Sequence, residues 1–438
     1  MTPTQQPKPP LRATIAWIFY DFANTAYSMN IVSLYFSTWI IIELSQRDAY
    51  VSIANSLSMI LVALTMPVLG DFSDFKGKKL SSLFIFTMSC IAGITLMGVL
   101  GYYVNNVSVL MPAVLVLFVM TNYSYQGGLV FYNALMPSVS TPKTIGRVSG
   151  YGVALGYLGA IVGLAVAGVF VDGELFGAKL AGVSPGGARA AFFPTAVLFF
   201  IFAIPIFFFV KESRSKQQEE SKWNIKDSYI KIRQTIIDTN RHPGLLRFLI
   251  AKLLYEDSIQ TVIIFMGVYT QAVMGFTRAE ANQFFTIVIP SAIIGSAFCG
   301  ILTDHYGPKK TLFWVILLWI TSLAVVIMTS NRTLFWVLGG IIGALMGSTW
   351  TSARPLLISL VPKENLGEFF GLYSLSGKLA AVIGPLIWSA VTFSLDKYGD
   401  VVKYKAAIGA MAILMIAGLF TLRPVPDFHK KIKASTRK

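Results

Sequence analysis

Two groups of polar side chains with the same spacing lie inside apolar segments of the chain. In each group an acid is followed by an amide three residues later and by a threonine four residues later. In a helix this spacing places all three side chains on one face. A buried acid beside an amide can hold and release a proton as its solvation changes, although a purely structural hydrogen-bond network would use the same residues. The two groups are Asp21, Asn24 and Thr25, and Asp257, Gln260 and Thr261.

Three further charged side chains lie within apolar segments, where a charge normally faces a partner or a water-filled cavity. Glu256 lies about 100° round a helix from Asp257, so it either stands in for that acid or forms a separate ion pair. Lys378 is too deep to reach the membrane surface easily, and we expect it to meet an acid or a substrate carboxylate as a counter-charge. Arg354 lies about two helical turns before Pro362, which favours a structural ion pair near the interface.

A fourth apolar segment carries enough polar side chains to form part of a cavity wall. Asn122 and Gln126 are the candidates there, and Tyr20 is added because it directly precedes Asp21. The many other aromatic residues fit lipid-facing bulk or an interfacial belt.

The elements that hold these residues are membrane-spanning helices. Of 438 residues 55% are hydrophobic and only 13% are charged, whereas a soluble protein of this size needs charge over its whole surface. A helix needs about 20 apolar residues to cross a bilayer, and about twelve such runs occur. We predict an all-α membrane protein with spans at 14–42, 50–70, 80–102, 109–136, 148–170, 191–210, 246–272, 281–303, 311–330, 333–360, 370–395 and 405–422.

The formal net charge of +15 reflects membrane topology rather than nucleic-acid binding. Of the 36 Lys and Arg residues, 25 fall on one side of the predicted membrane, 8 on the other and 3 within spans. The positive-inside rule then places both termini in the cytoplasm. The cysteines, Cys90 and Cys299, lie in different spans, and no histidine has a partner at ligand spacing, so we expect no metal site. No nucleotide-binding or other cofactor motif is present, and no catalytic constellation indicates an enzyme.

Internal repeats divide the chain into two halves of six spans. Two loops, 230 residues apart, share glycine, aspartate, glycine and a basic pair. Glycines can permit close helix packing and a sharp turn, while the acid can accept hydrogen bonds from a helix N-terminus or pair with a base. These features predict a gating latch, the alternative being loops that only set topology. The residues are Gly70, Asp74, Gly77, Lys78 and Lys79, and Gly300, Asp304, Gly307, Lys309 and Lys310.

Two other repeats follow the same order along the chain. Four glycines of the fifth span recur in the eleventh with an offset of 221, and the acid–amide–threonine group recurs with an offset of 236. We predict a half at 1–212, a cytoplasmic linker at 213–245 with an amphipathic helix, and a half with a basic tail at 246–438. The helix is predicted from Ile225, Tyr229, Ile232 and Ile236.

This arrangement resembles the major facilitator superfamily, whose members move solutes by alternating access between two six-helix halves. A narrower resemblance lies at Trp17–Tyr27, which reads WIFYDFANTAY. This stretch is similar to the first-helix signature of the vacuole-effluxer family, and Gly156–Gly159 and Gly371–Lys378 also look like family segments. The family's autophagy-related permeases are thought to release amino acids from the yeast vacuole. Chain length and short loops suit a bacterial inner-membrane member.

The sequence and the resemblance together predict a secondary transporter of amino acids or similar small metabolites. Its energy would come from a solute or ion gradient, with protons or another ion as the coupling species, and its partners would be the substrate and the lipid bilayer. Asp21 and Asp257 would couple transport or orient the substrate, and the neighbouring amides and threonines would form a hydrogen-bonding wall. We expect a monomer. A multidrug or sugar exporter is an alternative, and a non-transporting receptor or scaffold is an alternative of another class.

Overall fold

The computed structural model describes residues 9–175, 178–179, 182, 184–212, 224, 226–230, 234 and 243–428, without the side chains at 48, 278–279, 281–283, 285–286 and 378–382. It divides into two compact units. The first comprises residues 1–141 and 155–223, and the second comprises 142–154 and 224–438. Helix α6 therefore contributes residues 145–154 to the second unit and the remainder to the first.

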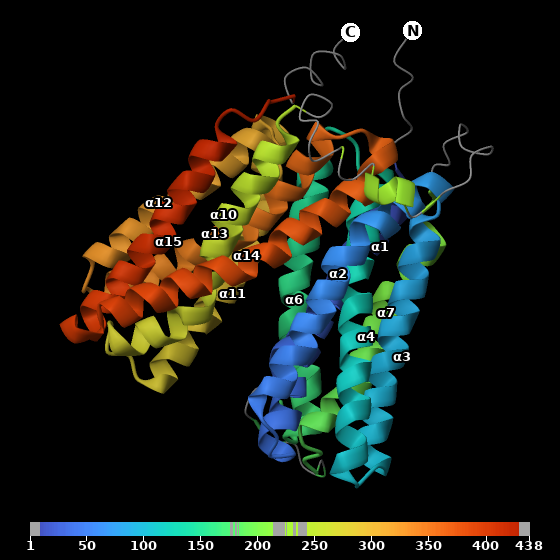
Figure 1. The fold of residues 1–438 in the computed structure, drawn as a ribbon, viewed down its shortest axis with the longest axis horizontal. Helices are drawn as coiled ribbons and strands as arrows, with labels where there is room; N and C mark the ends of the chain where they lie inside the picture. Colours follow the sequence, from blue (N-terminus) through green and yellow to red (C-terminus); the bar gives the residue numbers. More distant parts are fainter. Residues whose placement is uncertain are drawn as a thin grey trace. The chain divides into compact units, whose positions relative to one another are not determined.

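The first unit consists of long helices that pack pairwise (Figure 1). α3 packs on α4 and α7, α2 packs on α4, and α1 packs on α7 and α8. α6 approaches α1 closely at three glycines, which suits membrane helices, whose backbones meet best at small residues. The elements are α1 (Leu11–Tyr27), α2 (Asp48–Lys76), α3 (Lys79–Tyr103), α4 (Val107–Ala134), α5 (Met136–Val139), α6 (Ile145–Val171), α7 (Phe192–Ala203) and α8 (Pro205–Phe209).

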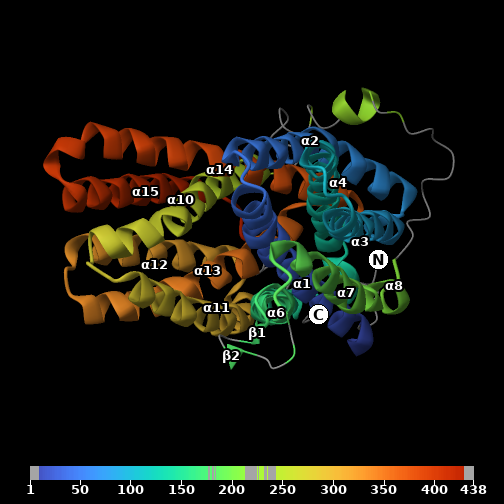
Figure 2. The same cartoon turned by 90° about the horizontal axis from the view of Figure 1, so that it is seen from below.

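The second unit contains two sets of three mutually packed helices, visible in Figure 2 as α10, α14 and α15 and as α11, α12 and α13. α12 also packs on α15 and joins the two sets. The elements are α10 (Leu245–Ala272), α11 (Arg278–Tyr306), α12 (Pro308–Met328), α13 (Arg332–Leu360), α14 (Leu366–Ser394) and α15 (Asp400–Leu422). The short 3-10 turns η4 (Lys363–Asn365) and η5 (Asp396–Tyr398) precede α14 and α15.

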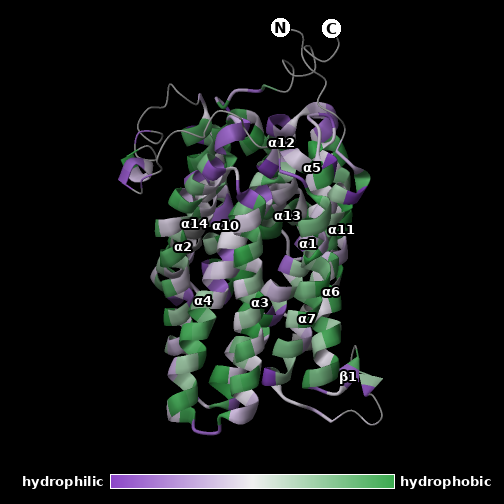
Figure 3. Cartoon of the chain, turned by 90° about the vertical axis from the view of Figure 1, so that its right-hand side faces the viewer, coloured by the Kyte–Doolittle hydropathy of each residue, from purple (hydrophilic) through white to green (hydrophobic). Residues whose placement is uncertain are grey.

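Ten helical segments among the described residues are long and apolar enough to cross a membrane. α10 is also long enough, but it contains Arg247, Lys252, Glu256 and Asp257 and is therefore more polar. In α14 the apolar stretch is Ile383–Ser394. Figure 3 shows hydrophobic residues along most of the length of α3, α4 and α6. The predicted all-α membrane fold is confirmed.

Local structure is more varied than regular spans joined by plain loops at three places. The first span continues beyond α1 as two π-helical segments, η1 (Ser28–Tyr35) and η2 (Thr38–Glu43), instead of one regular helix. The loop after α6 contains a short antiparallel pair, β1 (Glu174–Leu175) and β2 (Ala178–Lys179). The sixth span begins with the 3-10 turn η3 (Ala188–Ala191).

The predicted linker helix falls largely outside the described residues. Residues 226–230 are helical and include exposed Tyr229. Ile225, Ile232 and Ile236 lie outside the described residues.

Candidate transport site

In the acid–amide–threonine group of α1 the acid and the amide are buried, and the threonine is half-buried. Asp21 is 4% exposed and Asn24 is 3% exposed. The Thr25 hydroxyl donates to the backbone carbonyl of Asp21 at 3.0 Å. Among the described residues, the Asn24 side-chain nitrogen has no hydrogen-bond partner although it is buried. A buried unsatisfied donor is costly, so a polar solute or water would stabilise it.

Glycines of α6 set how close that helix comes to α1. A Cβ atom at Gly159 would lie 2.3 Å from the Phe22 carbonyl oxygen, and one at Gly156 would lie 2.7 Å from the Thr25 hydroxyl. Both distances are too short for a real side chain. The two helices therefore touch at backbone distance beside the α1 group.

Tyr20 points into the packed interior of the first unit. Its hydroxyl lies 2.6 Å from the Thr87 hydroxyl of α3, and its ring stacks on Tyr132 of α4 with centroids 5.0 Å apart. Tyr132 also stacks on Trp17 and accepts its indole N–H through the backbone carbonyl at 3.0 Å. These contacts make Tyr20 a packing residue of α1, α3 and α4.

The two polar candidates of α4 behave differently. The Asn122 amide donates to Asn55 at 3.0 Å and to Ser58 at 2.8 Å, which ties α4 to α2. No hydrogen bond from a described residue holds Gln126, which is 8% exposed. Gln126 is therefore the α4 candidate with free hydrogen-bonding capacity.

The matching group of α10 anchors that helix to α14. Asp257 accepts the backbone N–H of Gly384 at 2.8 Å. A Cβ atom at Gly384 would lie 2.1 Å from the Thr261 hydroxyl, so a side chain there would displace the group. The Thr261 hydroxyl is buried and, among the described residues, has no hydrogen-bond partner. Gln260, the third member, is half-buried.

Glu256 forms an ion pair, which is one of the two possibilities that the sequence left open. It pairs with Lys252 one helical turn earlier. The Trp350 indole N–H of α13 donates to its other oxygen at 3.4 Å. The Lys252 ammonium lies over the Tyr373 ring of α14, 4.0 Å from the ring centroid. Three helices of the second unit thus converge on one charged pair.

Two predicted charged residues are less fully described. The side chain of Lys378 lies outside the described residues, so its predicted counter-charge role stays a prediction. Arg354 is half-buried on α13, one helical turn beyond Trp350.

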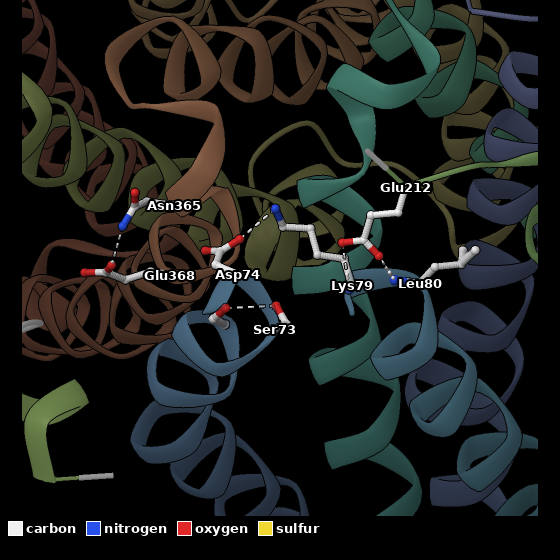
Figure 4. A network of polar contacts seen from close by, with 8 residues as sticks. Ser73, Asp74, Lys79, Leu80, Glu212, Asn365 and Glu368 are labelled. Carbon is white, nitrogen blue, oxygen red and sulfur yellow. Dashed lines mark hydrogen bonds and ion pairs between the residues drawn. The ribbon is translucent and has the colours of Figure 1, made fainter. Parts of the chain in front are cut away.

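The first glycine–aspartate loop joins α2 to α3 with a left-handed turn. Gly77 ends α2 with φ +57°, a conformation that favours glycine. Asp74 pairs with Lys79 at 2.7 Å (Figure 4). Glu212 accepts the first backbone N–H groups of α3, from Lys79 at 3.0 Å and from Leu80 at 3.2 Å. The carboxylate therefore caps α3, as expected for an acid at a helix N-terminus.

Two further hydrogen bonds of this loop are local. The Ser73 hydroxyl donates to the Gly70 carbonyl at 2.8 Å, and the Lys78 backbone N–H donates to the Ser73 carbonyl at 3.0 Å. They complete the end of α2 without involving the Lys78 ammonium.

The second loop makes more extensive contacts inside its unit. Asp304 accepts the backbone N–H of Gly146 at 2.7 Å and that of Arg147 at 3.2 Å, and it also pairs with the Arg147 guanidinium at 2.7 Å. It therefore has both contacts that the sequence pattern suggested, a helix N-terminus and a basic partner. Cβ atoms at Gly146 and Gly300 would each lie within 2.7 Å of the other's carbonyl oxygen.

The basic pair after this loop starts α12. Gly307 precedes the helix with φ +95°. The Lys309 ammonium donates to the Arg423 carbonyl at 2.9 Å, while Lys310 lines a cavity of about 380 Å³ with Lys309, Phe313, Trp314, Arg423 and Asp427.

Sequence reasoning assigned no role to Lys252, Trp350 or Tyr373. The i, i+4 spacing of Lys252 and Glu256 was a usable signal, because this spacing pairs opposite charges on a helix. The aromatic partners come from α13 and α14, and no spacing along the chain could have brought them to α10.

A family model described as "Vacuole effluxer Atg22 like" matches residues 40–435. A protein of Bacillus subtilis (strain 168), "Uncharacterized MFS-type transporter YxiO", is 26% identical over 94% of both chains. "Multidrug resistance protein MdtG" of Dickeya zeae (strain Ech586) is 25% identical over 87% of both chains. "Autophagy-related protein 22" of Coccidioides immitis (strain RS) is 23% identical over 62% of this chain and 47% of its own.

Solved structures of major facilitator proteins share the fold. The human organic anion transporter MFSD10 superposes with a TM-score of 0.71 at 14% identity, covering 95% of this chain and 100% of its own. The proton:xylose symporter XylE superposes with a TM-score of 0.69 at 12% identity, covering 95% of both chains. The chain is a multi-pass membrane transporter that belongs to the vacuole effluxer Atg22-like family and has the major facilitator fold.

Proposed function

We propose that this transporter moves amino acids or similar small metabolites by alternating access, driven by a proton or other ion gradient. The observation that carries the proposal is the repeated acid–amide–threonine group. One copy lies on α1 and the other on α10, and Asp21 and Asp257 are both buried. Ionisable residues inside membrane spans usually mark solute or proton pathways. In this role Asp21 would carry the coupling function, while the Gly384 contact of Asp257 supports a positioning role for the second acid.

The two glycine–aspartate loops would close the cytoplasmic side of the solute path. The hydrogen bonds of Asp304 to the start of α6 support such a latch, because they hold two helices by a contact that a modest movement would break. The charge distribution supports a topology with both termini in the cytoplasm. The bacterial relatives support a location in a bacterial inner membrane. In this arrangement the halves would be 1–212 and 246–438, joined by the linker at 213–245.

The test is uptake of a pool of labelled amino acids into proteoliposomes, with and without an imposed pH gradient. Wild-type protein should show uptake that the gradient stimulates, and Asp21→Asn should lose the stimulation. Asp396→Asn is the matched control, since its acid is exposed and lies outside the long helices. Gradient-stimulated uptake that survives in Asp21→Asn would refute the coupling role. Absence of amino-acid uptake by folded wild-type protein would refute the substrate class.

A multidrug exporter is the second candidate function. It is favoured by the relative named "Multidrug resistance protein MdtG", which matches 87% of this chain. Transport of a labelled bulky apolar cation that amino acids do not inhibit would support this function over amino-acid transport.

A further inference from the structure

The Lys252–Glu256 ion pair is the most unusual charged feature of the second unit. Both side chains project from α10, and they are 2% and 13% exposed. Replacing a buried ion pair with apolar residues of similar volume is often neutral or stabilising. Helix stability alone therefore does not explain this pair.

The surroundings of the pair provide recognition chemistry. The Tyr373 ring covers the Lys252 ammonium, an arrangement in which the aromatic face attracts a cation. The Trp350 N–H reaches Glu256 at 3.4 Å, longer than the usual 2.9–3.0 Å of an N–H···O bond. Among the described residues this long contact is the one partner of that Glu256 oxygen, which leaves it with capacity to accept further hydrogen bonds.

Gly377 lets the α14 backbone lie directly beside the pair. A Cβ atom at this position would lie 2.8 Å from the Lys252 ammonium nitrogen and 3.2 Å from a Glu256 carboxylate oxygen. Any side chain at this point of α14 would crowd both charged groups at once.

We propose that Lys252 and Glu256, with Tyr373 and Trp350, bind the charged head of a zwitterionic solute. The inference rests on the proposed transport function and names the chemistry that selects its substrate. The solute's carboxylate pairs with Lys252 and its ammonium pairs with Glu256, in exchange for the ion pair present in this structure.

Charge balance favours a zwitterion over a singly charged solute. The protein pair is neutral overall, and a zwitterion gives each charge of the pair a new partner without adding net charge. A solute with only an amine would pair with Glu256 and leave the Lys252 ammonium without a carboxylate partner. A solute with only a carboxylate would pair with Lys252 and leave the Glu256 carboxylate without a cationic partner. An unpaired buried charge is strongly unfavourable, so both kinds of singly charged analogue should bind poorly.

The test is equilibrium binding of a labelled pool of neutral L-amino acids to purified protein, with competition by amines and carboxylates of the same carbon skeleton. The double variant Lys252→Met/Glu256→Gln removes both charges without leaving either one unpaired, which protects folding. It should bind the pool at least about tenfold more weakly, because hydrogen bonds to charged groups are among the strong ones. The double variant Arg332→Met/Glu280→Gln is the control, since it removes a partly exposed ion pair.

The outcomes separate the inference from the transport proposal. Unchanged binding in Lys252→Met/Glu256→Gln, with amino-acid uptake by wild type, would overturn the inference alone. Competition by the matching amines or carboxylates that is as strong as competition by the amino acids themselves would also overturn it. Binding that the variant loses, without uptake by wild type, would support the site and refute the transported substrate. Failure of wild type to bind any of the zwitterions would refute both.

Discussion

Asp304 should hold the start of α6 against α11, and its removal should release that helix end. The first backbone N–H groups of a helix have no partner within the helix. Here the N–H groups of Gly146 and Arg147 donate to Asp304 instead. Hydrogen bonds to a charged group contribute about 1.5–3 kcal/mol each. The Arg147 side chain is 45% exposed, so screening reduces its ion pair to at most about 1 kcal/mol.

Asp304→Ala should therefore lower the free energy of unfolding by about 2–4 kcal/mol, because the longer of the two backbone bonds is the weaker one. Asp304→Asn keeps one acceptor oxygen without the charge and should lose about half as much. The direct assay is hydrogen exchange of the Gly146 and Arg147 amides in detergent micelles or nanodiscs. Both amides should exchange faster in Asp304→Ala than in wild type.

The control is Asp396→Ala, which removes an acid whose side chain is 71% exposed and pairs with Lys403. An exposed ion pair contributes about 0–1 kcal/mol, so this variant should leave stability and the α6 amides almost unchanged. Unchanged exchange of the Gly146 and Arg147 amides in Asp304→Ala would refute the reasoning. The start of α6 would then be protected by something other than this carboxylate.

Two further predictions concern helix packing and helix capping. Gly150→Ala places a Cβ atom 2.5 Å from the Ser296 carbonyl oxygen, so it should destabilise the protein by about 1–3 kcal/mol. Gly267→Ala, where no atom lies within 4 Å, should not do so when both are compared by thermal unfolding. The Glu280 carboxylate accepts hydrogen bonds from the Thr277 backbone N–H and from the Arg332 guanidinium. These bonds hold the pKa of Glu280 below its ordinary value of 4.5. The cap of α11 should therefore be intact near neutral pH and weaken as the pH falls below 4.5, and Glu280→Gln should remove this dependence of amide protection.

Most of the fold could be predicted because the bilayer restricts the chain to long apolar helices. The predicted span at 80–102 corresponds to α3 at Lys79–Tyr103, and the loop glycines mark where helices end. The π-helical segments after α1 were not predicted. Their hydrogen bonds shift by one residue, and apolar side chains such as those of 28–43 give no sign of that shift.

The site was predictable where the chemistry lies along one helix. The spacing of Asp257 and Thr261 predicts one common face of α10, and in the structure both side chains lie beside Gly384 of α14. Contacts between helices were not predictable in this way. Asn122 hydrogen-bonds to Asn55 of α2, and only the packing of α2 on α4 determines that partner.

The most direct test of transport by alternating access is counterflow in proteoliposomes. Vesicles are loaded with unlabelled amino acids and diluted into a trace of the labelled pool, with no ion gradient. A carrier that exposes one site to each side in turn should accumulate label transiently above the outside concentration, and Lys252→Met/Glu256→Gln should abolish the overshoot. Two results with folded wild-type protein would contradict the account: the label inside the vesicles only reaches the outside concentration, or no label enters.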